Sequence, residues 1–225
     1  DLGNDASLQL SFPVTLSAWV NAGDYTGAHI FTSDHADAAY SGVQFYLNSS
    51  GYLGAAFGSG GDCSSIYRKS IAASSNKLSI GTWYQVTAVL TNANTFKLYV
   101  NGSEVSTYGS FSGSATTIGY TSGTARIGQT RGGCSAPSAM PTDLKIDEVK
   151  VQNIAASPDW IRAQYLSTSD AGFVSYGAEE SPPPPNTPTI VTITAQLDRV
   201  ATVDAVVPVT VTGTTLASVA LAVGT

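Results

Sequence analysis

The sequence predicts an all-β fold, a sandwich or barrel of antiparallel strands with one short helix. Three observations predict it. Short apolar or alternating segments rich in β-branched and aromatic residues recur through the first 155 residues, turn residues close each of them, and only one segment carries helix-start signals. With 225 residues, 43% of them hydrophobic, the chain is long enough to bury one sizeable core.

The clearest strand segments are residues 15–20, 43–47, 82–90 and 96–100. Turns at residues 48–51, 91–94 and 101–103 separate them, and the last is a strong hairpin signal because Asn101 and Gly102 accept positive φ. This order predicts an antiparallel meander. Residues 107–123 are rich in Ser, Thr and Gly, which predicts a long surface loop.

The helix signal lies near residue 157. Ser157 is a good N-cap, Pro158 fits the first helical position and Asp159 lies in the first turn. Trp160 and Ile161 follow as apolar positions, so we expect a short helix packed on the strands.

The C-terminal part changes in composition. Residues 181–188 contain a run of four prolines, which predicts an extended linker. Residues 189–225 hold two or three further strands, too few for an independent domain, so we expect a β-strand tail or a truncated domain after a main domain at residues 1–180.

Composition and charge exclude several classes of function. Only 12% of residues are charged, against about 25% in an average domain, and 10 basic residues are scattered among 16 acidic ones for a net charge of −6. No basic stripe can follow a phosphate backbone, so we expect no nucleic-acid partner. No apolar run reaches about 18 residues, so we expect no membrane span.

Two cysteines, Cys63 and Cys134, lie in Gly/Ser-rich stretches where free thiols would be exposed. We interpret them as a disulfide, which indicates an oxidising compartment. Two reduced loop cysteines are the alternative, and a zinc site would have to recruit His29 and His35.

Several segments together resemble the laminin G-like, concanavalin A-like jelly-roll family, whose fold is an antiparallel two-sheet sandwich. The segments that carry the resemblance are residues 1–8, 16–20, 83–86, 97–102 and 146–151. Residues 157–165, with Phe173, Gly177, Glu179 and Glu180, are similar to the closing segment of bacterial and archaeal cell-surface members. The tail is similar to the opening strands of Ig-like or Calx-beta-like repeats.

One departure from the family concerns the N-terminus. Family members usually have an apolar strand before the Asp1–Asp5 segment, and here the chain starts after it. Truncation explains this, or another segment fills the sheet edge. An open edge accepts an added strand, so the tail at residues 189–212 is predicted to pair with a neighbouring subunit.

Catalysis is not expected. Hydrolases of this superfamily use two carboxylates that flank the scissile bond. The four glutamates form no such pair, since Glu148 has only Asp147 beside it, on the opposite face of a strand.

A binding site is predicted at one end of the strands. If successive strands alternate in direction, the loops at residues 34–41, 59–66 and 91–94 share one end, and the proposed disulfide brings residues 131–140 to it; we call these four loops the loop rim. Its carboxylates, amides and aromatic rings suit the recognition of sugars or of Ca²⁺-bridged glycans, although an ordinary polar loop end has the same composition. The rim also holds Asn94, and the candidate ligand-binding residues are Asp34, His35, Asp37, Tyr40, Asp62, Tyr67, Asn92 and Arg131.

A structural calcium ion is a further expectation. Asp147 alternates with Val149 and Val151, which predicts an inward-facing carboxylate that needs a partner. The resemblance implies that Asp147 holds Ca²⁺ together with oxygens of Asn4 and Asp5. Hydrogen bonds from backbone amides are the alternative.

These observations favour a secreted or cell-surface lectin-like adhesion module that binds a glycan or a surface protein. The alternative is a structural subunit of an extracellular filament or surface array, assembled by self-association through the C-terminal strands.

Overall fold

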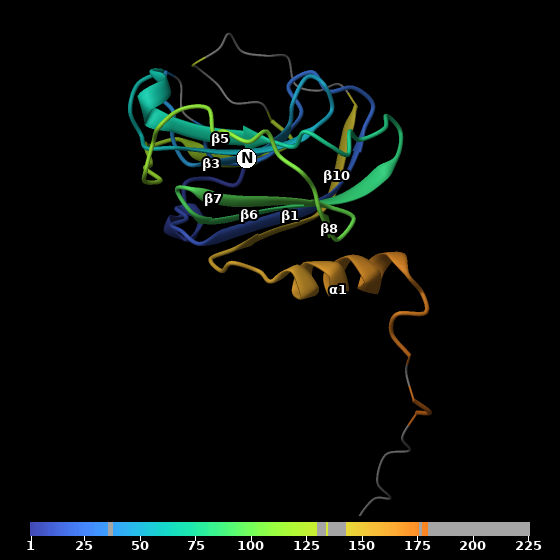
Figure 1. The fold of residues 1–225 in the computed structure, drawn as a ribbon. Helices are drawn as coiled ribbons and strands as arrows, with labels where there is room; N and C mark the ends of the chain where they lie inside the picture. The colour runs from blue at the N-terminus through green and yellow to red at the C-terminus, as the bar shows by residue number, and fades with distance from the viewer. Residues whose placement is uncertain (36–37, 130–133, 135–142, 176, 180–225) are drawn as a thin grey trace, which may run out of the picture. The chain divides into compact units, whose positions relative to one another are not determined.

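The fold is that of a computed structural model, which describes residues 1–35, 38–129, 134, 143–175 and 177–179. Residues 1–175 form one unit, which contains every helix and strand of the described part of the chain. Two antiparallel five-stranded sheets face each other with the hydrophobic core between them (Figure 1). The predicted all-β two-sheet sandwich is confirmed.

The first sheet has the order β10-β1-β6-β7-β8. Its strands are β1 (Val14–Ala22), β6 (Trp83–Asn92), β7 (Thr95–Val100), β8 (Ser103–Glu104) and β10 (Leu144–Gln152). Asn101 and Gly102 have φ values of 50° and 74°, as the predicted hairpin between β7 and β8 requires.

The second sheet has the order β5-β4-β3-β2-β9. Its strands are β2 (His29–His35), β3 (Val43–Leu47), β4 (Leu53–Gly58), β5 (Arg68–Ala72) and β9 (Thr124–Ile127). The predicted meander holds for β2 to β5 and for β6 to β8. It fails at β1, β9 and β10, because closing a two-layer core requires these strands to pair with partners distant in sequence.

Alternation along the strands builds the core. Leu16, Ala18 and Val20 of β1 face Phe45 and Phe57 of the other sheet within one buried cluster. The residues between them point to the outer face, where Ser17 is also buried. This outer face is therefore covered by another element.

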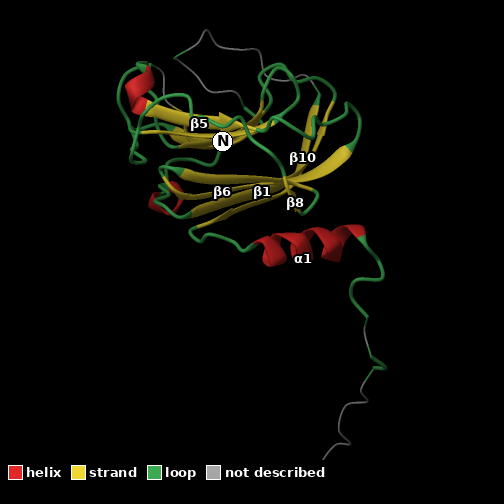
Figure 2. Ribbon diagram, viewed as in Figure 1, coloured by secondary structure: helices red, strands yellow, loops and turns green. Residues whose placement is uncertain are grey.

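That element is helix α1 (Pro158–Ser169), which lies along the outer face of the first sheet (Figure 2). The Ser157 hydroxyl accepts a hydrogen bond from the Trp160 N–H at 3.2 Å, so the predicted N-cap is confirmed. Ile161 is buried with Val89 and Tyr99, whereas Trp160 remains 41% exposed. None of the helices in the described residues has the length and apolarity needed to cross a membrane.

Two short 3₁₀ helices complete the described elements. The first, η1 (Ala6–Leu8), lies near the N-terminus, and the second, η2 (Ser65–Tyr67), interrupts the loop between β4 and β5. The segment before η1 is tied to β9, since the Leu2 N–H donates to the Ala125 carbonyl at 2.8 Å. The long loop predicted at residues 107–123 contains isolated bridges and no strand.

Candidate functional site

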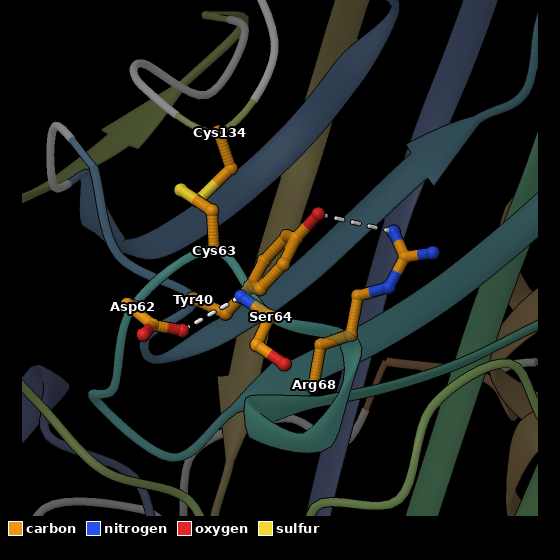
Figure 3. The surroundings of a disulfide bond; sticks show 6 residues. All are labelled: Tyr40, Asp62, Cys63, Ser64, Arg68 and Cys134. Atoms are coloured by element: carbon orange, nitrogen blue, oxygen red, sulfur yellow. Dashed lines mark hydrogen bonds between the residues drawn. A yellow bond between two sulfur atoms is a disulfide. The ribbon is translucent and has the colours of Figure 1, made fainter.

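Hydrogen bonds and a disulfide bring the described loops of the rim together. Tyr40 pairs with Gly61 in an isolated antiparallel bridge, in which the Tyr40 N–H donates to the Gly61 carbonyl at 3.0 Å. Cys63 forms a disulfide with Cys134, as predicted from the composition around both cysteines (Figure 3). The 34–41 and 59–66 loops and the point of attachment of the 131–140 loop therefore lie side by side.

A tyrosine and an arginine meet at this end of the second sheet. The guanidinium carbon of Arg68, the first residue of β5, lies 5.1 Å from the centroid of the Tyr40 ring, which is a cation–π contact. Arg68 Nη1 donates to the Tyr40 hydroxyl at 3.4 Å (Figure 3). Arg68 Nη2 donates to Ser112 Oγ at 3.2 Å. Both Tyr40 and Arg68 are half-buried, so each presents part of its side chain at the surface.

Asn94 ties the 91–94 turn to the same end. Lys69 follows Arg68, and its ammonium group donates to Asn94 Oδ1 at 2.8 Å and lies 5.3 Å from the Phe111 ring centroid. Lys69 is 7% exposed, so this buried contact links β5 of the second sheet to the β6–β7 turn of the first. The structure thus places the three described loops at one end, as the alternation of strand direction predicts.

Two predicted ligand residues of the rim are exposed and shape their own turns. Asp62 Oδ1 accepts from the Ser64 N–H at 2.8 Å, and Asn92 Oδ1 accepts from the Asn94 N–H at 2.8 Å. Each leaves its other polar atoms at the surface, so these side chains can contact a ligand without breaking the fold.

Tyr67 lies beneath the loop that carries Asp62. A Cβ atom on Gly61 would approach the Tyr67 ring to 2.3 Å, so only glycine allows this close contact between loop and ring. The Tyr67 carbonyl accepts from the Ser59 N–H at 2.9 Å. Tyr67 therefore supports the 59–66 loop from below and is half-buried.

Asp34 does not lie in a loop, which corrects the sequence-based assignment. Strand β2 extends to His35, and its pairing with Thr124 of β9 holds this end in the sheet. Asp34 is 1% exposed, and its carboxylate accepts hydrogen bonds from both the backbone N–H and the hydroxyl of Thr121. Its position is that of a structural anchor for the Thr121 loop. Asp37 and Arg131 lie outside the described residues.

The three predicted calcium ligands each bond within their own segment. Asp5 is the N-cap of η1 and accepts from the Ser7 N–H at 2.8 Å, and the hydrogen bonds from Ser7 hold the pKa of Asp5 below its ordinary value. Asn4 Oδ1 accepts from Gln9 Nε2 at 3.3 Å. Asp147 Oδ1 accepts from the Glu148 N–H at 2.8 Å.

Asp147 is exposed, contrary to the inward orientation predicted from its alternation with Val149. Glu148 has a φ of 51°, and the register between β1 and β10 shifts opposite this residue, which marks a β-bulge. The bulge changes which side chains of β10 face the core on either side of it. Ile146 and Val149 both pack against the core, and Asp147 lies between them on the surface. In the part of the chain that the structure describes, no group of three or more His, Cys, Asp or Glu residues could hold a metal ion.

Sequence reasoning gives Arg68 and Lys69 no role, and the structure places both at the rim. The alternating pattern of strand β5 does not predict which aromatic rings its basic side chains will contact. The available signal is the pair of basic residues directly after Tyr67, at the predicted rim, in a chain with only 10 basic residues.

Comparison with known proteins identifies the family of this chain. No curated protein matches the chain. Among solved structures, the CBM40 domain of the Ruminococcus gnavus sialidase, bound to α2,3 sialyllactose, is 14% identical over 71% of this chain and 86% of that chain, with a TM-score of 0.49. A heptameric SAP-like pentraxin from Limulus polyphemus is 16% identical over 73% of this chain and 79% of that chain, with a TM-score of 0.43.

The binding domain of botulinum neurotoxin serotype G is 12% identical, with a TM-score of 0.47, over 75% of this chain and 42% of that chain. The family model is more specific, because it matches the sequence itself from residue 2 to residue 162. This chain belongs to the concanavalin A-like lectin/glucanases superfamily, in its laminin G-like branch.

Proposed function

We propose that the chain is a lectin-like module that binds a carbohydrate through the loop rim around Tyr40 and Arg68. The observation that carries this proposal is the half-buried Tyr40 ring, which contacts the Arg68 guanidinium at the end of the sandwich that also carries the exposed side chains of Asp62 and Asn92. Sugars offer hydroxyl groups, which need polar partners, and C–H faces, which pack on aromatic rings.

The described part of the rim is held in place without a ligand. The Tyr40–Gly61 bridge, the Cys63–Cys134 disulfide and the Lys69–Asn94 bond fix three loops relative to the two sheets. A fixed site loses less conformational entropy on binding than a mobile one, which favours the recognition of small, weakly apolar ligands such as sugars.

Binding is proposed rather than hydrolysis, although the superfamily includes both lectins and glucanases. Glycosidases need two carboxylates that face each other across the scissile bond. Glu104 pairs with Lys97 at 2.9 Å and Glu148 pairs with Lys150 at 3.2 Å, so both glutamates already have cationic partners on separate strands.

An extracellular location fits this function. Disulfides persist in oxidising compartments, and the Cys63–Cys134 bond joins two loops of the proposed site. Secretion and a role in surface adhesion are part of the proposal.

Assembly through the C-terminal strands is a weaker candidate. The predicted tail at residues 189–212 lies outside the described residues. The edge strand β10 carries the bulge at Glu148 and the charged Lys145 and Lys150, features that discourage edge-to-edge pairing.

The test is a glycan array followed by titration calorimetry with the best-bound saccharide. Tyr40→Ala is expected to weaken binding by about tenfold or more, because it removes the ring from the site. Tyr108→Ala is the matched control, since Tyr108 is 55% exposed and its N–H donates to the Ala72 carbonyl at the opposite end of β5. Absence of binding to every glycan, or equal affinity of wild type and Tyr40→Ala, would refute the proposal.

A further inference from the structure

Arg68 has no acidic partner in the described residues. The ion pairs there join Lys97 to Glu104, Arg126 to Asp1 and Lys150 to Glu148. The chain carries 16 acidic residues against 10 basic ones, so carboxylates outnumber cations, and yet none of the described ones pairs with this guanidinium.

The hydrogen-bond partners of Arg68 are neutral. Its two hydrogen bonds go to the Tyr40 hydroxyl and to Ser112 Oγ, and Nε is buried with no partner among the described atoms. A guanidinium has more N–H donors than these bonds use. The Arg68 guanidinium is partly removed from water and has no opposite charge beside it, which is unfavourable. An anionic ligand that bound the guanidinium would therefore interact with it strongly.

Lys69 adds a second positive charge at the same end of β5. Its ammonium group bonds to the amide oxygen of Asn94 and lies against the Phe111 ring, again without a carboxylate among the described residues. Lys69 is buried, so it does not contact a ligand directly. Its charge nevertheless adds to the positive potential beside Arg68, where low-dielectric surroundings screen it less than water would.

Asp62 is the nearby exposed carboxylate of the described rim. Its Oδ1 accepts from the Ser64 N–H within its own turn, and Figure 3 shows this bond apart from the Arg68–Tyr40 bond. A carboxylate on one side of the rim and a guanidinium on the other is an arrangement suited to a ligand that has hydroxyl groups and one anionic group, rather than to a uniform polyanion.

We propose that Arg68 makes the described part of the loop rim, around Tyr40 and Asp62, specific for anionic saccharides, whose carboxylate or sulfate group binds the guanidinium while the sugar ring packs on Tyr40. This inference rests on the proposed lectin function and names its ligand class. Arg68 acts here as a specificity-determining residue, because planar guanidinium groups match the oxygens of carboxylates and sulfates in pairs.

The experiment uses an array of neutral, carboxylated and sulfated glycans, and each acidic glycan is paired with its methyl ester or its desulfated form. The protein is expected to bind acidic glycans at least about tenfold more tightly than their neutral counterparts, with affinity falling as salt rises. Arg68→Ala should abolish this preference. Arg68→Lys should keep part of it, because lysine retains the charge but not the paired donors.

Arg162→Ala is the matched control, because it removes the same side chain and charge from the exposed face of α1. Thermal melting of each variant checks that the fold is retained. Equal affinity for acidic glycans and their neutral counterparts would overturn the anionic specificity and leave the lectin function standing. A preference for acidic glycans that survives in Arg68→Ala would overturn the role of Arg68. Absence of binding to any glycan would overturn both.

Discussion

Replacing Asp34 with alanine tests whether this residue anchors a loop or contacts a ligand. The carboxylate is buried and accepts two hydrogen bonds from Thr121, so Asp34→Ala leaves a backbone N–H and a hydroxyl without their acceptor. Hydrogen bonds to a charged group contribute about 1.5–3 kcal/mol each, so the two together predict a loss of about 3–6 kcal/mol in the free energy of unfolding. For a domain of this size that loss lowers Tm by about 6–24 °C.

Urea denaturation followed by tryptophan fluorescence measures this change. Asp62→Ala is the control, because Asp62 is exposed and water replaces its single turn bond, so its effect should stay within about 0.5 kcal/mol. Asp34→Asn should fall between the two, since its amide oxygen still accepts one bond. If Asp34→Ala loses less than about 1 kcal/mol, the anchoring role is wrong.

Three further predictions address the disulfide, the loss of stability at high pH and the effect of calcium. Reduction of Cys63–Cys134, which closes a separation of 71 residues, should lower the free energy of unfolding by about 2–4 kcal/mol in urea titrations with and without reductant, and an unchanged midpoint would contradict this. Burial raises the pKa of Tyr120, whose hydroxyl donates to the Leu10 carbonyl at 2.9 Å. Its neutral form therefore stabilises the fold below pH 10.0, the unfolded value, and this contribution is lost as pH rises through the higher pKa of the folded state. Tyr120→Phe should flatten the fall in Tm above that pH, and a slope equal to that of wild type would contradict it. Addition of Ca²⁺ or chelator should leave Tm unchanged if the predicted calcium ligands are only turn residues, and a Tm that rises with Ca²⁺ would restore the predicted site.

The sequence is most informative where local chemistry decides the structure. The strand at Val43–Leu47, the Asn101–Gly102 turn and the Ser157 N-cap depend on neighbouring residues, and all three are confirmed. The Cys63–Cys134 disulfide belongs with them, because only two cysteines are present to pair.

The predictions from sequence are wrong where pairing between strands distant in sequence decides the position of a residue. Asp34 resembles the start of a polar loop in sequence, yet pairing with β9 draws it into β2 and buries it. Asp147 follows a simple alternation, and the bulge at Glu148 that reverses its orientation depends on the register against β1. A bacterial or archaeal source and an Ig-like repeat after the linker remain predictions.

The position of α1 has a consequence for how this unit would respond to tension. The helix is held on the first sheet by a small apolar cluster of Val89, Tyr99, Ala156 and Ile161, and the chain continues beyond it. Beyond this cluster, the Trp19 and Tyr165 rings lie 6.0 Å apart, and Thr15 Oγ1 bonds to the Ile154 carbonyl and the Ala156 N–H just before the helix. Buried oxygens of Ser17 and Thr87, on the strands of that sheet, have no hydrogen-bond partner among the described atoms. A pull on the C-terminal side would peel α1 away turn by turn, whereas the strand ladders behind it would have to shear together. We expect single-molecule stretching to show a short extension at low force, from release of the helix, before the sandwich itself yields. A single step at high force would show that the helix and the sheets share the load.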